Sequence, residues 1–377
     1  MEGLRGVAAL LVLLVHFHSL FIPFAGGTET VRSVSLFLST IGHTGVDLFF
    51  VLSGYLMYGV MLRADFRLLP YLRRRAARLY PVFLAVFICY IALSYVFPEK
   101  SKLPAWPWDV ALYLCANLLM LPGILPIQPM ITQAWSLSYE WLFYLAGPLV
   151  VLVTGLRHRP WQARVILLLG LAAGYLALCA LRLALHPRMT MFLAGCVLWE
   201  AARNGLLVRF LSRWGEGLAV AAFLANLALI GWLVADPNRP VAVFHVNPGY
   251  YTGLFFFTSF WFVGYGLFYR GWLARFFSLD PLRWAGNISY SYYLVHGMVL
   301  HGLRLAARMV LPADAATPWL YALLFAVALA ATLTAGAVFY LLFEKPFLHV
   351  PAARPADGRV GYYGLDTIPT SPKAIKE

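Results

Sequence analysis

The first apolar run of the chain, Glu2 to Phe24, carries two polar side chains at a spacing that could serve chemistry. Arg5 and His16 are eleven residues apart. At 100° per residue this is about 20° more than three full turns, so both side chains lie on one helix face, about 16 Å apart along the axis. An imidazole inside an apolar helix is costly without a cavity or partner, which makes His16 a candidate functional residue. The alternative is a core histidine bonded to a neighbouring helix.

The second candidate stretch is GHTGVDLFFVLSGYLM, from Gly42 to Met57, where Asp47 and Ser53 interrupt an apolar, aromatic-rich helix. A carboxylate near His16 would fix the tautomer of the imidazole and raise its basicity. The alternative for Asp47 is a carboxylate that interacts with the dipole at the start of a helix. Three glycines allow neighbouring backbones or a ligand to approach closely: Gly42, Gly45 and Gly54.

The stretch YLRRRAARLYP places Arg75 and Arg78 at i, i+3, on one helix face. Paired guanidinium groups suit the planar, bidentate binding of phosphates. The same residues are also a topology signal, and their spacing does not separate the two interpretations.

Carboxylates and a histidine also occur in three later stretches. Glu140 lies among the aromatics of TQAWSLSYEWLFY, which is unusual inside a membrane segment. His296 is two turns from Ser289 on nearly the same face, and His301 is a weaker candidate. Glu344, in FEKPF, either serves the site or forms an interface ion pair with Lys345.

Composition determines the class of protein. The 377 residues are 62% hydrophobic and only 12% charged, whereas a soluble domain is about 25% charged. Several apolar runs are long enough to cross a bilayer, so we predict an all-α polytopic membrane protein. The net charge of +13 comes from short basic loops and does not indicate nucleic acid. The four cysteines have neither disulfide-framework nor metal-type spacing, and we expect no metal site.

Positive loops orient the predicted segments. The arginine-rich loop Arg63–Arg78 should be cytoplasmic. The stretch 109–122 is short and followed by prolines, so we interpret it as re-entrant or partial. We therefore expect about ten transmembrane helices plus this segment, both termini inside, a membrane domain over 1–347 and a disordered cytoplasmic tail over 348–377. The predicted segments are 6–24, 36–60, 79–97, 109–122, 135–154, 165–185, 189–202, 217–235, 250–269, 286–310 and 319–343.

Together and in this order, the motifs resemble the acyltransferase-3 family of integral-membrane O-acyltransferases. The resemblance covers about residues 2–347, and the chain is similar to the stand-alone type, without a fused extracytoplasmic esterase-like domain. It rests on Leu4-Arg5-Gly6 with Ala8 and Ala9, His16, Gly45-Val46-Asp47, Phe49-Phe50, Ser53-Gly54, Arg75 and Arg78 before Pro81, Trp135-Ser136-Leu137 with Glu140, Ser289-Tyr290, Tyr293-Leu294 before His296, and Glu344 with Pro346.

The resemblance implies transfer of an acyl group, usually acetyl, from cytoplasmic acyl-CoA to a hydroxyl of a glycan or lipid-linked saccharide across the cytoplasmic (inner) membrane. His16 would be the general base. Arg5, Asp47 and Glu140 would assist it, and Arg75, Arg78 and Ser53 would bind the donor. We expect no tightly bound cofactor. A separate extracytoplasmic acyltransferase is a possible partner. The rival hypothesis is a transporter of a small anionic or acylated substrate, because buried charges and broken helices also mark permeation pathways.

Overall fold

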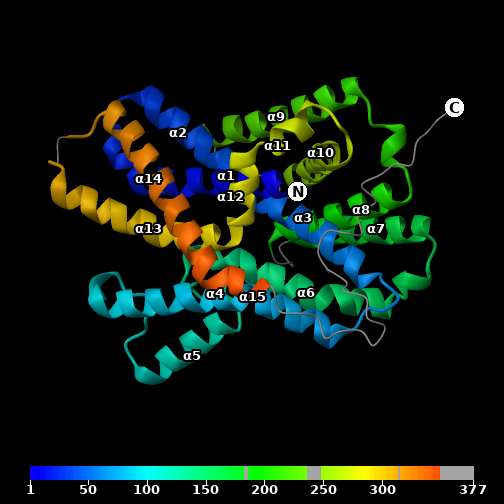
Figure 1. The fold of residues 1–377 in the computed structure, drawn as a ribbon, viewed down its shortest axis with the longest axis horizontal. Helices are drawn as coiled ribbons and strands as arrows, with labels where there is room; N and C mark the ends of the chain where they lie inside the picture. The colour runs from blue at the N-terminus through cyan, green and yellow to red at the C-terminus, as the bar shows by residue number, and fades with distance from the viewer. Residues whose placement is uncertain (182–185, 236–247, 313–314, 349–377) are drawn as a thin grey trace.

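A computed structural model describes residues 1–181, 186–235, 248–312 and 315–348 of the chain (Figure 1). Within these ranges the regular structure is helical and there are no strands. The helices are α1 (Glu2–Phe21), α2 (Glu29–Gly42), α3 (Thr44–Met61), α4 (Leu68–Val96), α5 (Pro107–Leu118), α6 (Trp135–Val153), α7 (Trp161–Ala180), α8 (Thr190–Arg203), α9 (Arg213–Ala235), α10 (Pro248–Phe268), α11 (Trp272–Phe277), α12 (Asp280–Asn287), α13 (Ser289–Val310), α14 (Pro318–Phe339) and α15 (Lys345–Leu348).

Seven helical segments within the described residues are long and apolar enough to cross a membrane. They support the predicted class, an all-α multi-pass membrane protein. The number of ten crossings and the orientation remain predictions. The helix α5 has 12 residues, about 18 Å, which is shorter than the roughly 30 Å hydrocarbon layer. Of the predicted tail 348–377, all but Leu348 lies outside the described residues.

The predicted segment 36–60 is two helices, α2 and α3, which meet at His43. Together they extend over 33 residues, about 50 Å at 1.5 Å per residue. Both pack closely on α1. A Cβ atom added to Gly42 would lie 2.4 Å from the carbonyl oxygen of Leu11, and one added to Gly45 would lie 2.3 Å from that of Ala8. The predicted close backbone approach at these glycines is therefore confirmed.

The arginine-rich stretch is mostly helix, and the prediction of a loop as far as Arg78 is wrong. The helix α4 begins at Leu68, eleven residues before the predicted segment 79–97, and includes Arg73 to Arg78. Arginine is a good helix former, and a proline such as Pro70 is tolerated in the first turn. The paired arginines are therefore held on a regular helix.

The helices α3 and α8 also approach each other through glycines. An added Cβ at Gly54 would lie 2.0 Å from the Phe192 carbonyl oxygen, and one at Gly195 would lie 2.0 Å from the Val51 carbonyl oxygen. The backbones touch in both directions, so neither position accepts a side chain without separating the two helices.

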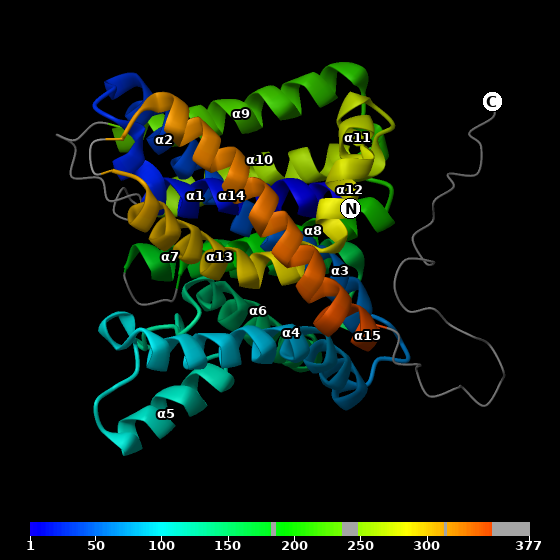
Figure 2. The same cartoon turned by 60° about the vertical axis from the view of Figure 1, so that its left-hand side comes forward.

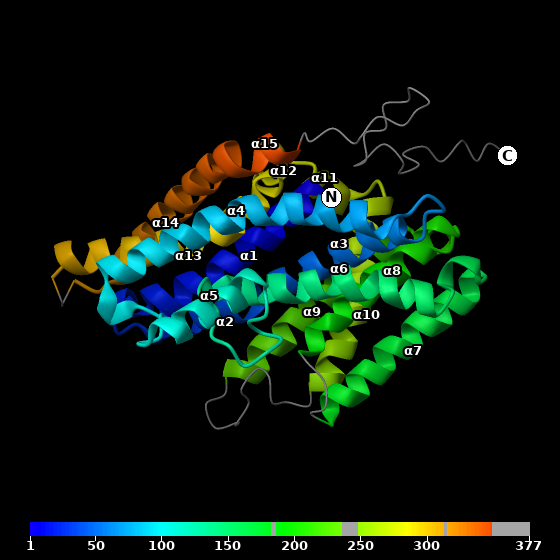
Figure 3. The same ribbon diagram turned by 90° about the horizontal axis from the view of Figure 1, so that it is seen from below.

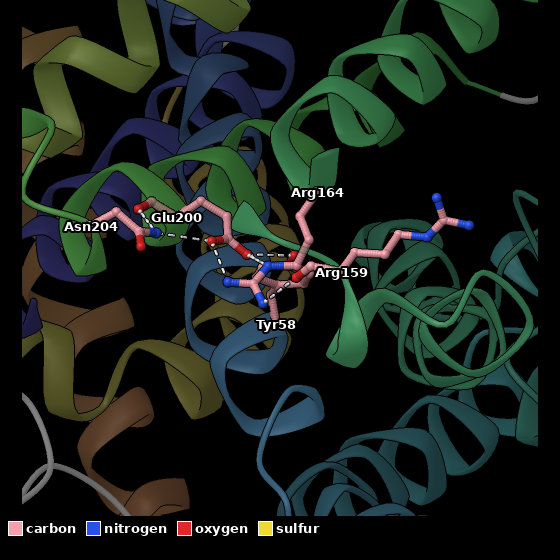
Figure 4. Close-up of polar contacts among 5 residues, drawn as sticks. All are labelled: Tyr58, Arg159, Arg164, Glu200 and Asn204. Atoms are coloured by element: carbon pink, nitrogen blue, oxygen red, sulfur yellow. Dashed lines mark hydrogen bonds and ion pairs between the residues drawn. The ribbon is translucent and has the colours of Figure 1, made fainter. Parts of the chain in front are cut away.

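A buried polar cluster ties α7 to the same pair of helices (Figure 4). Glu200 of α8 is fully buried, and its Oε1 lies 2.6 Å from Arg164 Nε of α7. The hydroxyl of Tyr58, from α3, donates to the same oxygen at 2.8 Å. Asn204 Nδ2 donates to Oε2 at 3.1 Å. Because its partners satisfy both oxygens, the buried carboxylate holds three helices in register.

The first helix lies at the centre of this arrangement. It contacts α2, α3, α12 and α13, and Figures 1 and 2 show it among these helices. Figures 1 and 2 show α4, α5 and α6 at the lower side of the molecule, which faces the viewer in Figure 3. The site described next lies where α1, α3, α4, α6 and α13 meet.

Candidate active site

A cavity that is partly open to solvent lies between five helices. It is lined by Arg5 of α1, by Ser53 of α3, and by a pair of arginines on α4. The α6 and α13 helices complete it with mostly polar or aromatic side chains. The polar and aromatic lining residues are Arg5, Phe49, Phe50, Ser53, Arg75, Arg78, Ser136, Glu140, Tyr144, Ser289, Tyr290 and Tyr293.

Three guanidinium groups converge on this cavity. Arg75 and Arg78 face it from one side of α4, while Arg73 and Arg74 are exposed. Arg75 lies over the rings of Tyr71 and Tyr144, 6.0 and 5.9 Å from their centroids. Its Nε is buried and has no hydrogen-bond partner among the described residues. An unsatisfied buried donor between arginines is the environment that an anionic ligand would complete.

Glu140 faces the cavity with its carboxylate held by two hydroxyls. Ser53 Oγ donates to Oε1 at 2.8 Å. The Tyr144 hydroxyl, one turn further along α6, donates to the same oxygen. Donors that favour the charged form fix the carboxylate, so Glu140 and Ser53 are one unit although they lie on different helices.

His16 does not line the cavity; it lies beyond the cavity's inner wall, next to His296. The two ring centroids are 5.1 Å apart. Tyr293 connects them to the cavity, since it lines the cavity and its ring lies 5.9 Å from that of His296. His296 is fully buried and stacks on Tyr292 at 5.6 Å. The shared face of Arg5 and His16 therefore runs from the cavity to a histidine pair.

Asp47 has a different partner from the one we expected. Its Oδ1 lies 3.4 Å from Arg188 Nε, and both side chains are nearly buried. The described contacts place no hydrogen bond or ion pair between Asp47 and His16. A buried carboxylate needs a cation to offset desolvation, and Arg188 supplies it. Asp47 therefore positions Arg188 in this structure.

Glu344 lies near the C-terminal end of the helical part of the chain, and its side chain lies in the region of the cavity arginines. It ends a π-helical turn, Tyr340–Glu344. Its Oε2 accepts hydrogen bonds from the backbone N–H and the hydroxyl of Ser291, at 3.2 and 2.5 Å. Glu344 is buried and lies within electrostatic range of Arg78 and Arg5. These hydrogen bonds do not test the alternative interpretation of Glu344, an interface ion pair with Lys345.

Sequence reasoning missed Arg188, and it named Tyr290 and Tyr293 as motif residues without a role. Arg188 follows a predicted outward-going segment and so contradicts the positive-inside pattern, which is a signal that could have identified it. Apart from their place in the motif, the tyrosines gave no signal of a role, because aromatics are common in membrane helices. Their roles come from contacts: the Tyr290 hydroxyl donates to the Leu79 carbonyl at 2.6 Å, and the Tyr293 hydroxyl donates to that of Gln133 at 3.0 Å.

The fold and site define a multi-pass membrane protein with a cationic cavity among its helices. The chain belongs to the acyltransferase-3 family: the family model, described as an acyltransferase domain, matches residues 1–341. The predicted resemblance is confirmed.

Three relatives show how far the likeness extends. The exopolysaccharide production protein ExoZ of Rhizobium meliloti is 28% identical over 334 residues, which cover 84% of this chain and 92% of ExoZ. The O-acetyltransferase OatA of Staphylococcus aureus is 25% identical over 327 residues, 78% of this chain and 49% of OatA. The acyltransferase MdmB of Streptomyces mycarofaciens is 32% identical over 153 residues, 40% of this chain and 38% of MdmB. No solved structure matches the chain.

Proposed function

We propose that this protein transfers an acyl group, in the first instance acetyl, from cytoplasmic acyl-CoA to a hydroxyl of an extracytoplasmic or lipid-linked glycan. Family membership supports acyl transfer, and the names of OatA and ExoZ support O-acetylation and a polysaccharide acceptor. The observation that carries the proposal is the cavity in which Arg5, Arg75 and Arg78 meet Glu140. We place the protein in the cytoplasmic membrane.

Acyl-CoA suits the lining of this cavity. Its phosphates are polyanionic, and guanidinium groups bind phosphate oxygens in bidentate fashion. Arg75 and Arg78 would hold these phosphates, and the unpartnered Nε of Arg75 would gain an acceptor. The extended arm of CoA would then run past Tyr293 toward the histidine pair and carry the thioester there.

His16 would act as the general base. A nitrogen of its neutral ring accepts the proton of the acceptor hydroxyl while the hydroxyl oxygen attacks the thioester carbonyl. The new C–O bond forms, the C–S bond breaks, and the CoA thiolate takes the proton from the imidazolium. The products are an ester and free CoA. Arg188, paired with Asp47, would offer a positive charge on the outer side of this path.

The decisive experiment is acyl transfer by the purified protein in lipid nanodiscs. Acetyl-CoA labelled in the acetyl group is supplied with glycans from the parent organism, and ester formation is followed by mass spectrometry. We expect label in the glycan with the wild-type chain and none with His16→Ala. Surface glycans of a deletion strain should lose the same ester. Uptake of an anionic substrate into proteoliposomes without any ester formed would instead support the transporter hypothesis and contradict our proposal.

A further inference from the structure

A second group of cations lies at the end of the bundle opposite the arginines of the cavity. Arg73 to Arg78 occupy the first turns of α4, whereas Lys100 and Lys102 follow its last residue, Val96. The α13 helix begins beside the cavity at Ser289 and Tyr290 and ends at Val310. Figures 1, 2 and 3 show the C-terminal ends of α4 and α13 at the same end of the molecule.

Four cations and one histidine, whose ring is neutral at pH 7, form this group, which we call the outer cation cluster. His301 lies within electrostatic range of Lys100, Lys102 and Arg304. Arg304 lies within range of Arg308. Like charges repel at these separations, so their accumulation costs free energy unless a counter-charge is present. The members are Lys100, Lys102, His301, Arg304 and Arg308.

In the part of the chain that the structure describes, none of these cations is paired with a carboxylate. No carboxylate there forms an ion pair with a member of the cluster, although Glu99 is a chain neighbour of Lys100. Lys102 Nζ already has three acceptors, the Pro129 and Met130 carbonyls and the Thr132 hydroxyl. Arg304 Nε is buried without a hydrogen-bond partner among these residues. Lys100, His301 and Arg308 are exposed.

Topology does not explain these charges. Basic residues accumulate in short loops on the cytoplasmic side of the membrane. The orientation predicted from the Arg63–Arg78 stretch puts this end of the bundle outside. Cations on the outer side are contrary to that rule. Together with the unsatisfied donor Arg304 Nε, they indicate an anionic ligand.

The cluster is also connected to the cavity by one face of α13. Tyr290, Tyr293, Gly297, Arg304 and Arg308 follow one another at spacings of three, four or seven residues, with His301 between them, and so share a stripe. The first two line the cavity. Gln133 packs on the stripe at Gly297, where an added Cβ would lie 1.8 Å from its Nε2. Arg304 is eleven residues beyond Tyr293, about 16 Å along the helix.

We infer that the outer cation cluster binds the acidic groups, carboxylate or phosphate, of the acceptor glycan and so directs a neighbouring hydroxyl toward the histidine pair. The inference rests on the proposed function in one respect: it identifies the bound glycan as the acyl acceptor. The binding itself depends only on the cluster. Arg304, Arg308, His301 and Lys100 would contact the anion, and Lys102 would hold the segment that leads into α6.

The test measures binding without any acyl donor. Wild-type protein in neutral phosphatidylcholine nanodiscs is titrated with an oligogalacturonate, a chain of uronic acids, and with a neutral maltooligosaccharide of equal length. Arg304→Gln combined with Arg308→Gln should weaken oligogalacturonate binding by about tenfold or more, since hydrogen bonds to charged groups are lost. Binding of the neutral sugar should not change. Arg275→Gln, at an exposed position of α11, is the matched control and should bind like wild type.

Equal oligogalacturonate affinity in the wild type and the double variant, with the same thermal unfolding profile, would overturn the inference. A third arm measures retained phosphatidylglycerol by native mass spectrometry. A double variant that loses this lipid but keeps its oligogalacturonate affinity would show a headgroup site and would also overturn it. A wild-type protein that binds the acid but transfers no acyl group would contradict the proposed function alone.

Discussion

The ring centroids of His16 and His296 lie 5.1 Å apart. His296 Nδ1 lies 3.2 Å from the Tyr292 carbonyl oxygen, which can only accept, so Nδ1 carries the proton in the neutral ring. The other nitrogen, Nε2, is buried without a partner among the described residues. It is therefore an acceptor, in a ring whose centroid lies 5.1 Å from that of His16.

Replacing His16 tests the general base. We expect His16→Ala to lower kcat for acyl transfer by about 10²–10⁴-fold, the usual contribution of a positioned base. The KM for acyl-CoA should change little, because the cavity that would bind the phosphates is not lined by His16. His18→Ala is the control: it removes an imidazole from the same helix that bonds Ser35 instead. Equal activity of His16→Ala and wild type would exclude the role.

An experiment can distinguish two roles of the arginine pair on α4, acyl-CoA binding and a topology signal. Arg75→Ala and Arg78→Ala should each raise the KM for acyl-CoA by about tenfold or more, because each removes a charge-assisted contact. Arg73→Ala removes the same charge from an exposed position of the same helix and should leave KM unchanged. If all three variants behaved alike in equilibrium CoA binding, the pair would serve topology only.

Glu140 accepts two hydrogen bonds at one carboxylate oxygen, so its charge can be tested without changing its size. We expect Glu140→Gln to lower kcat/KM by about tenfold or more, since charge-assisted hydrogen bonds are about twice as strong as neutral ones. Tyr144→Phe should have a smaller effect because Ser53 still donates. Steady-state kinetics with a fixed acceptor measures both. A larger loss for Tyr144→Phe would mean that the tyrosine, and not the carboxylate, is the functional group.

The contact between α3 and α8 predicts a specific stability difference. Gly195→Ala would place Cβ about 2.0 Å from a backbone oxygen of α3 and should destabilise the protein by about 1–3 kcal/mol through overpacking. Gly174→Ala in α7 meets nothing within 4 Å, so it should be neutral or stabilise by up to about 1 kcal/mol through helix propensity. Denaturant unfolding in detergent compares the two. Equal stability would show that α3 and α8 separate freely.

The orientation can be tested by single cysteines in a cysteine-free background. Thr30→Cys and Leu103→Cys should react with an impermeant thiol reagent added outside intact cells. Asp65→Cys, in the connection between α3 and α4, should react only after lysis. The reverse pattern would overturn the predicted orientation and, with it, the outward position of the outer cation cluster.

The sequence by itself determined the membrane class, most of the helical segments though not all of their bounds, and the candidate residues of α1, α3 and α4. These depend on local periodicity and hydropathy, which need no knowledge of distant contacts. The motif order was enough to indicate the family. The alignment of Arg5 with His16 and the close approach of α1 at Gly42 and Gly45 also follow from spacing and residue type alone.

Only the tertiary structure decided which side chains meet. Ser53 and Glu140 are 87 residues apart, and Asp47 pairs with an arginine of the turn that precedes α8, so neither contact has a local signal. The same holds for His16 and His296, whose helices lie near opposite ends of the chain. Buried charges choose partners by the desolvation that packing imposes on them. That packing exists only after α1, α3, α6, α8 and α13 have come together.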